Sequence, residues 1–120
     1  MTRTLLSFLG LASFTHAGIF LGQGTMSGEA TDTSVFLQTR LTLAAELDAS
    51  GDLPGASGVV AFEWSLNENF EDSSTTPVQK SKDFIVRAKL SELKRHTAYF
   101  YRAHYGASET DTKTGATSTF

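Results

Sequence analysis

The sequence predicts an all-β fold, and within that class a fibronectin type III or immunoglobulin-like β-sandwich of about seven strands. Residues 84–90 and 99–104 alternate inward and outward side chains with a period of two, which is typical of strands with one face in a core. Between these segments, Leu93, Thr97 and Tyr99 have the spacing of a tyrosine corner, whose ring fills the core while its hydroxyl binds upstream backbone. The predicted inward residues of the two segments are Phe84, Val86, Ala88 and Leu90, followed by Tyr99, Tyr101 and Ala103.

The remaining elements follow from the same alternation and from clusters of Gly, Ser, Asp and Pro that favour turns. In chain order we expect a Gly-rich first strand or bulged edge at 22–30, a strand at 33–43, a loop at 44–58, a strand at 59–66, a polar stretch at 67–77, a short strand at 78–80, the two strands described above, a hairpin loop at 106–111 and a last strand at 112–120. This regular spacing of short strands is that of a sandwich.

Two of these strands carry specific core predictions. One face of the segment 33–43 holds Val35, Leu37, Thr39 and Leu41, and one face of the segment 59–66 holds Val60, Phe62, Trp64 and Leu66. We expect Trp64 to be buried, because one large ring can bridge two sheets that lie about 10 Å apart. Phe70 is the expected anchor of the polar stretch.

The first residues differ from the rest of the chain. Arg3 gives a short positive start, residues 4–14 form an apolar run too short to span a bilayer comfortably, and Ala17 supplies a small residue at the exit. We therefore expect a secretory signal peptide at 1–17, a sandwich domain at 18–120, and a secreted or periplasmic location. A hydrophobic first strand and a membrane anchor are the alternative interpretations of the same run.

Composition restricts the classes of function. A chain of 120 residues has room for one domain, and its net charge of -3 argues against a basic surface for nucleic acid or anionic lipid. The chain has no cysteine, which excludes disulfides, thiolate catalysis and every cysteine-based metal site within it. We expect no nucleic-acid partner, and no membrane partner once the signal has been cleaved.

The residues that commonly carry catalysis form no recognisable site. His16 lies in the expected signal, His96 in the corner and His104 on the outward face of a strand, and they share no metal-ligand spacing. No serine lies in a G-x-S-x-G elbow. We therefore predict no catalytic, cofactor-binding or metal-binding residue and no cofactor in this chain.

Two acidic loops could bind Ca²⁺ and one group of glycines could bind phosphate, although a structural role is the better interpretation of both features. Carboxylate oxygens suit Ca²⁺, yet neither loop matches the D-x-[DN]-x-[DN]-G pattern, so we expect solvated polar loops. The acidic residues are Glu46, Asp48 and Asp52 in one loop and Glu68, Glu71 and Asp72 in the other. Gly22, Gly24 and Gly28 lack the spacing of a phosphate-binding loop, and turns or a bulge are the expected use.

Aromatic and arginine side chains suggest a docking face. Two interpretations are open: an exposed patch on one sheet that binds a partner domain or a sugar, or cross-strand pairs that stiffen the sheet. The residues concerned are Phe36, Phe100 and Tyr105, together with Arg40, Arg87 and Arg102.

The order of these features resembles the N-terminal domain of alkaline phosphatase D-like (PhoD-like) proteins over residues 20–120. The segment GTMSGEATDTSVFLQTRLT is similar to that family's G-x-x-S-G turn and the S-V-x-L-x-T-R-L strand after it. The segments VVAFEWSLNENF, DFIVRAKLSELKRHTAYFYRAHYG and GATSTF are similar to later parts of the same domain. The matching positions in the first segment are Gly24, Ser27, Gly28, Ser34, Val35, Leu37, Thr39, Arg40 and Leu41. Departures are Glu29-Ala30 for Asp-Pro, Gln38 for Trp and Arg95 for Pro.

The resemblance implies a fibronectin type III-like N-terminal domain that precedes a metallophosphoesterase domain, which uses metals, commonly iron and calcium, to hydrolyse phosphate esters. The family's metal ligands, which include a cysteine, lie in that second domain, so no catalytic residue carries over to this chain. The first hypothesis is therefore the non-catalytic sandwich of a secreted PhoD-like phosphatase, present alone because the reading frame or gene model is truncated. The second is a free-standing secreted adhesion or glycan-binding module, and the third is an enzyme active as it stands.

Overall fold

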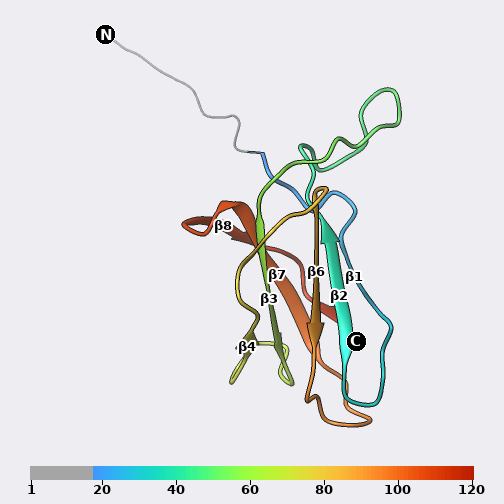
Figure 1. Ribbon diagram of the computed structural model, residues 1–120, viewed down its shortest axis with the longest axis vertical. Coiled ribbons are helices and arrows are strands. Elements are labelled where there is room, and N and C mark those ends of the chain that lie inside the picture. Colours follow the sequence, from blue (N-terminus) through green and yellow to red (C-terminus); the bar gives the residue numbers. More distant parts are fainter. Residues whose placement is uncertain (1–17) are drawn as a thin grey trace.

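The computed structural model describes residues 18–120, which form an all-β structure of two antiparallel sheets (Figure 1). The predicted signal peptide at 1–17, His16 included, lies outside the described residues. Residues 18–120 contain nine strands: β1 (Thr25–Gly28), β2 (Val35–Arg40), β3 (Val59–Ser65), β4 (Ser74–Thr75), β5 (Gln79–Lys80), β6 (Ile85–Leu90), β7 (Phe100–Ser108), β8 (Asp111–Thr114) and β9 (Ser118–Thr119).

The smaller sheet has the order β1-β2-β6. Its centre is the β2–β6 pair, in register from Val35 opposite Leu90 to Arg40 opposite Ile85 without a bulge. Every second residue of β2 is buried, as expected for a strand with one face in the core. On the far side of β2, β1 pairs in register from Thr25 to Gly28 and has no further strand beside it within residues 18–120.

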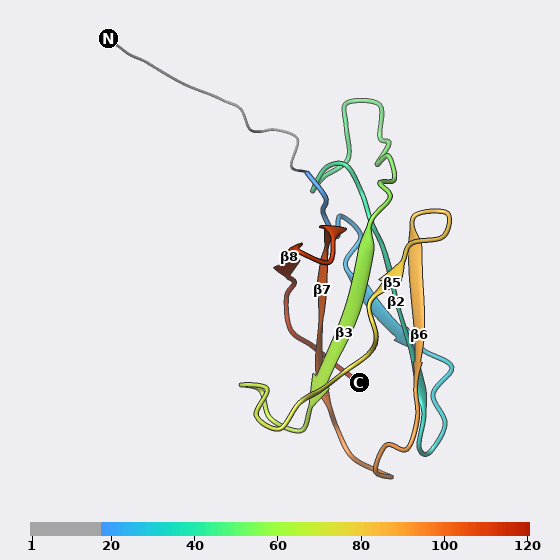
Figure 2. The same ribbon diagram turned by 60° about the vertical axis from the view of Figure 1, so that its left-hand side comes forward.

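The larger sheet has six strands built on the long pair of β3 and β7. Its main path is β4-β3-β7-β8, with β5 also on β3 and β9 also on β7. A register shift between Gly106 and Ser108 bends β7 against β8. Figure 2 shows the β3–β7 layer beside the layer that contains β2 and β6.

One core lies between the two sheets. It contains side chains from β2, β3, β6 and β7, and it also includes Leu93 and Tyr99 from the corner between β6 and β7. The largest of its fully buried side chains are Phe62, Leu37, Leu41, Leu90 and Val60. The predicted inward sets of β2, β6 and β7 are therefore confirmed, with the exception of Phe84.

Phe84 was predicted to face the core, but it is 40% exposed and precedes β6. Asp83 and Phe84 both have positive φ, at 51° and 67°, and Lys82 and Ile85 exchange both backbone hydrogen bonds across them. This geometry is that of a tight two-residue hairpin turn, which the chain makes with a Phe where Gly is usual. The turn rotates the Phe84 ring out of the alternation and over Gly55.

Trp64 and Leu66 also differ from their predicted positions. Trp64 is half-buried and packs against the core, while Leu66 is exposed and follows the end of β3. Trp64 is second from the end of β3, and Leu66 follows the last residue of the strand, so both side chains lie at the margin of the core. Phe70, by contrast, is buried and anchors the polar stretch as expected.

The count of nine strands exceeds the predicted seven for two reasons. The polar stretch contributes β4, and the predicted last strand is divided into β8 and β9. The hairpin loop predicted at 106–111 is also shorter, because β7 continues to Ser108 and β8 begins at Asp111. Within residues 18–120, no helix is long and apolar enough to cross a membrane.

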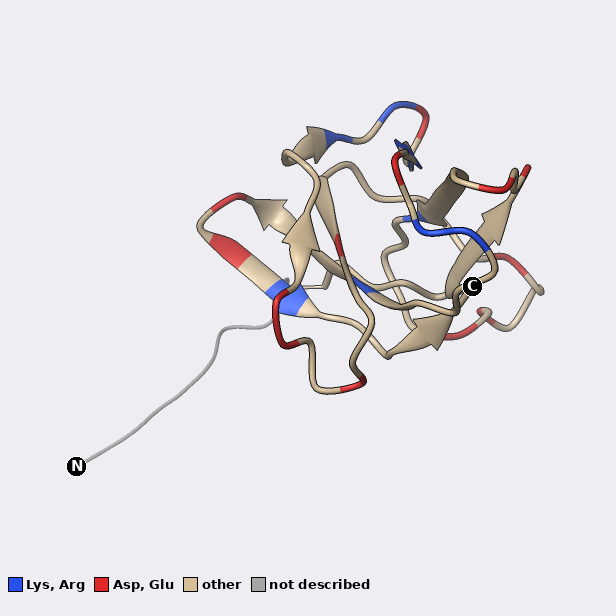
Figure 3. Ribbon diagram, turned by 90° about the horizontal axis from the view of Figure 1, so that it is seen from below, with Lys and Arg blue, Asp and Glu red and all other residues tan. Residues whose placement is uncertain are grey.

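Charged residues of both signs are interspersed around the strands and loops, as the view from below shows (Figure 3). This distribution agrees with the modest net charge of the sequence. Electrostatic steering by one large field of a single sign is therefore not a feature of the described domain.

Candidate functional site

The tyrosine corner lies where β6 turns into β7, at one end of the two sheets. The Tyr99 ring is buried, and its hydroxyl accepts a hydrogen bond from the backbone N–H of Lys94 over 2.8 Å. The backbone N–H of Leu93 donates to the carbonyl of Thr33 over 2.9 Å, which joins the corner to the loop before β2. His96 makes the turn with a positive φ of 51°. The corner predicted from the sequence is thus confirmed.

Phe120 is held against this corner on both its backbone and its ring. Its N–H and carbonyl each form a 3.0 Å hydrogen bond with the backbone of Tyr99. The Phe120 ring stacks on Tyr99 at 5.3 Å between ring centroids, with 17° between the planes, and meets the tilted ring of Tyr101 at 5.6 Å. These contacts fix the direction of the chain at Phe120.

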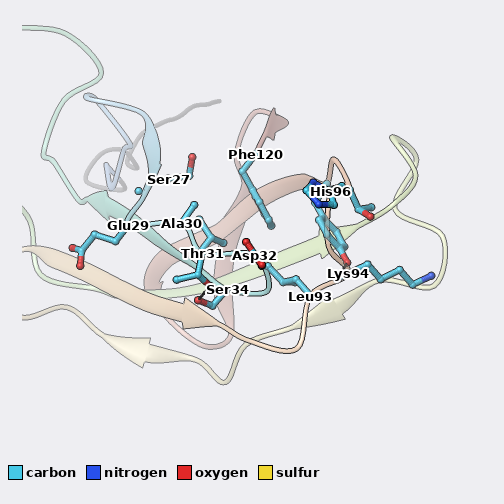
Figure 4. A pocket seen from close by; sticks show the side chains of 14 residues that line it. Ser27, Glu29, Ala30, Thr31, Asp32, Ser34, Leu93, Lys94, His96 and Phe120 are labelled. Carbon is cyan, nitrogen blue, oxygen red and sulfur yellow. Dashed lines mark hydrogen bonds between the residues drawn. The ribbon is translucent and has the colours of Figure 1, made fainter.

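A groove of about 490 Å³ opens beside the corner, between the end of β1 and Phe120 (Figure 4). Its apolar floor, which we call the groove floor, consists of Val35, Leu93, Tyr99 and Phe120. In the close-up, Glu29 and Ala30 lie to one side of Phe120 and His96 and Lys94 to the other. The remaining lining residues are Ser27, Gly28, Thr31, Asp32, Ser34 and Thr97.

The carboxylates at the groove rim already have cationic partners. Glu29 forms an ion pair with Arg87, and Asp32 lies 3.9 Å from Arg95. No group of three or more His, Asp or Glu side chains suited to a metal ion occurs in the part of the chain that the structure describes. The groove therefore offers an apolar surface with a polar rim.

A second feature is a polar cluster on the face of β3 and β7 that points away from the core. Glu63 is its centre: its Oε1 accepts a 2.8 Å hydrogen bond from Arg102 Nε and lies 2.8 Å from His104 Nε2. Its Oε2 accepts from the Ser73 hydroxyl over 2.6 Å. His104 Nδ1 lies 3.0 Å from the Thr114 hydroxyl on β8. The cluster ties together β3, β7, β8 and the loop before β4.

The cluster holds Glu63 as a carboxylate. Burial alone would raise the pKa of Glu63. Hydrogen bonds from Ser73, Arg102 and His104, together with the positive charge of Arg102, outweigh this effect and lower the pKa to about 2. The Arg102 guanidinium also lies over the Phe70 ring, 3.9 Å from its centroid. Arg102 and His104 on β7 both contact Glu63 on β3, so the chemistry of the cluster is that of a cross-strand brace.

The sequence did not reveal this cluster. Glu63, Arg102 and His104 each occupy an outward position of a predicted strand, but their meeting depends on the register that places Glu63 opposite Arg102 and Ala61 opposite His104. An acidic residue on one strand and two basic residues spaced by two on another is the signal that was available.

The proposed aromatic and arginine patch does not form on one sheet. Phe36 lies on β2 in the smaller sheet, with the Arg87 guanidinium 3.9 Å from its ring centroid, whereas Phe100, Arg102 and Tyr105 belong to β7 in the larger sheet. Tyr105 packs against the core, and Arg40 donates to the carbonyl of Leu53. Of the two interpretations left open by the sequence, a single patch on one sheet is therefore wrong, because strands β2 and β7 belong to different sheets.

In the first acidic loop, the Asp48 side chain makes local hydrogen bonds. The Asp48 carboxylate accepts hydrogen bonds from the backbone N–H groups of Ser50 and Asp52, both over 2.9 Å. The backbone of Asp52 and the Ser50 hydroxyl lower the pKa of Asp48. Gly24 has a φ of 72° and closes a turn onto Leu21, in agreement with its predicted use.

Comparison with known proteins identifies the family of this domain. The family model described as PhoD-like phosphatase, N-terminal domain, matches residues 12–120. Among solved structures, the chain is similar to the structure of PhoD, with 20% sequence identity and a TM-score of 0.65. The match covers 89% of this chain and 20% of the PhoD chain, so this chain spans about a fifth of that structure. No match was found among curated proteins.

The same fold occurs in the sensor domain of the anti-sigma factor RsgI4 in Pseudobacteroides cellulosolvens. One structure of that domain has 19% identity and a TM-score of 0.56, with 90% of this chain and 95% of that chain covered. A solution structure of it has 20% identity and a TM-score of 0.51, with 88% and 72% covered. At these identities the likeness concerns the fold alone, whereas the match to the family model extends over most of the sequence. The chain belongs to the family of PhoD-like phosphatase N-terminal domains.

Proposed function

We infer that this chain is the non-catalytic N-terminal β-sandwich of an exported PhoD-like phosphatase, and that it packs against a metallophosphoesterase domain. The observation that carries the proposal is the extent of the match: the family model is that of an N-terminal domain, and the chain spans 20% of the PhoD structure. The two-layer arrangement with a tyrosine corner supports a fibronectin type III-like character.

The iron and calcium expected of the family do not fit the residues described here. The chain has no cysteine, and residues 18–120 bring together no group of three or more His, Asp or Glu side chains. We therefore assign no step of phosphate-ester hydrolysis to this chain, and the metals belong to the proposed partner domain.

The absence of catalysis is tested directly. The purified chain is incubated with a chromogenic phosphodiester in the presence of Ca²⁺ and Fe³⁺, and no turnover above buffer is expected. Turnover that co-purifies with the chain and disappears in the Glu63→Gln or His104→Ala variant would contradict the proposal, because it would place the chemistry in the polar cluster.

Export is a separate part of the proposal. A positive start, a short apolar run and Ala17 support a signal peptide at 1–17, and hence a secreted or periplasmic location. N-terminal sequencing of the protein recovered from outside the cytoplasm is expected to begin near Gly18. A mature protein that retains Met1 would overturn it.

A free-standing binding module is the second candidate. The fold of this chain also makes up 95% of a sensor-domain structure, so the same fold is known without a phosphatase domain. Phe36 under Arg87, on the outer face of the smaller sheet, is the aromatic surface that such a module would use. A glycan array probed with the chain tests this candidate, with Phe36→Ala as the variant and Phe100→Ala as the matched control on the other sheet.

A further inference from the structure

The groove beside the tyrosine corner combines an apolar floor with a free strand edge. Ser27 and Gly28 of β1 line it, and β1 pairs with β2 alone within residues 18–120. A strand edge of this kind presents unpaired N–H and carbonyl groups, and proteins usually cover such edges. An extended peptide that added to β1 would satisfy them and would run along the mouth of the groove.

The chemistry of the groove selects a polypeptide rather than an ion. Its rim carboxylates, Glu29 and Asp32, are already opposite Arg87 and Arg95. Its floor is formed by Val35, Leu93, Tyr99 and Phe120; the first three are buried, and the half-buried Phe120 ring is the main apolar surface that the floor presents. An apolar side chain projecting from an extended backbone fits both the floor and the edge.

The position of Phe120 favours a domain attached to the same chain as the partner that occupies the groove. Phe120 forms part of the groove floor, its backbone is hydrogen-bonded to that of Tyr99, and its ring stacks on the Tyr99 ring. In a protein in which a catalytic domain follows this one, the connecting chain therefore starts at the groove in a fixed direction. A short tether raises the local concentration of the attached domain far above that of a free partner.

We propose that the groove docks an extended segment of the metallophosphoesterase domain, which adds to the edge of β1 and places an apolar side chain on the groove floor. This inference rests on the proposed function and assigns the surface through which that function is exercised. The outer face of the smaller sheet, which carries Phe36 and Arg87, stays free in this arrangement.

The absence of cysteine makes a thiol-labelling test possible. Residues 18–120 replace the matched fifth of PhoD in a chimera, and single cysteines are introduced both there and in the isolated chain. Thr31→Cys reports on the groove rim, Lys89→Cys on the outer face of the smaller sheet, and Ser108→Cys on the hairpin between β7 and β8; all three positions are exposed. Peptide mapping by mass spectrometry assigns each labelled thiol.

The proposal predicts that fusion slows labelling at Thr31→Cys by about tenfold or more, as expected for a site exposed only by local opening. Labelling at Lys89→Cys and Ser108→Cys is expected to stay within twofold of its rate in the isolated chain, which counts as about unchanged. Protection at Lys89→Cys or Ser108→Cys, with Thr31→Cys unchanged, would overturn the groove assignment and leave the proposed function intact. Unchanged rates at all three sites would overturn both.

A groove-filling variant gives a second measurement. Ala30 is exposed at the groove rim, so Ala30→Trp obstructs the groove without touching the core. It is expected to lower the melting temperature of the chimera and to leave that of the isolated chain unchanged. Ala107→Trp, at an exposed position on β7, is the matched control. Equal effects of the two substitutions in the chimera would contradict the proposal.

Discussion

The Tyr99 hydroxyl accepts a hydrogen bond from the backbone N–H of Lys94, five residues earlier in the chain, over 2.8 Å. This bond closes the turn between β6 and β7 while the Tyr99 ring stacks on Phe120. Tyr99→Phe keeps the ring and removes the bond, so we expect the free energy of unfolding to fall by about 1–2 kcal/mol. Denaturant titration measures it, with Tyr105→Phe as a control for the same chemical change outside the corner. An equal loss in the two variants would contradict a special role for this hydroxyl.

Glu63 predicts a dependence of stability on pH. Its pKa is about 2 in the folded protein, below the ordinary value of 4.5, so the native state favours the carboxylate. The stabilisation is fully present above about pH 4.5 and is lost as pH falls toward about 2. Between these values the unfolded chain takes up a proton on Glu63 while the folded protein does not, so acid favours unfolding.

Glu63→Gln should therefore flatten the change of unfolding free energy over this pH range. At neutral pH it should also destabilise the protein by about 1–3 kcal/mol, since Arg102 loses its carboxylate partner. Glu68→Gln, at an exposed position, is the control and should leave the pH profile of the native protein unchanged. If the unfolding free energy of Glu63→Gln falls with pH as steeply as that of the native protein, Glu63 is not the source of the pH dependence.

Gly106 and Gly28 offer a matched pair of substitutions. A Cβ at Gly106 would overlap the backbone carbonyl of Asp111 across the β7–β8 hairpin, whereas a Cβ at Gly28 meets nothing within 4 Å. Gly106→Ala should cost about 1–3 kcal/mol or more, because backbone must move to admit the methyl group. Gly28→Ala should change the stability by less than about 0.5 kcal/mol. Thermal unfolding of both variants tests the close approach, and similar melting temperatures would refute it.

Phe62 and Trp64 test the taper of the core along β3. Phe62 is fully buried, and its replacement by Ala should cost about 3–5 kcal/mol. Trp64 is half-buried near the end of the sheet, so Trp64→Ala should cost clearly less even though it removes a larger ring. Denaturant midpoints of the two variants give the order, and a larger loss for Trp64→Ala would place the centre of the core at the other end of β3.

The strands in which apolar and polar residues alternate regularly were predictable, because the apolar residues of this pattern are the buried ones. In β2 and β6 each apolar residue of the inward set reaches the core, and in β7 the tyrosine corner fixes which residue comes first. Phe84 failed because a left-handed turn placed an apolar side chain outside the strand, and a Phe gives no sign of such a turn. Turn chemistry of this kind is normally signalled by Gly or Asn.

The candidate site was less predictable, since it depends on contacts between distant segments. The groove brings Gly28 and Ala30 near Leu93, Lys94 and Phe120, which no local pattern relates. The polar cluster likewise requires the β3–β7 register. The sequence alone could not predict which of these residues lie next to one another in the folded protein.

The unbroken register between β2 and β6 also bears on how relatives of this domain can differ in length. One extra residue inside either strand would turn its buried set toward water, since each successive side chain points to the opposite face. Insertions and deletions among family members should therefore accumulate in the long connection after β2 and in the stretch around β4, and should spare residues 35–40 and 85–90. Size variation in this domain should therefore occur in these connecting segments, while the paired strands β2 and β6 keep a constant length.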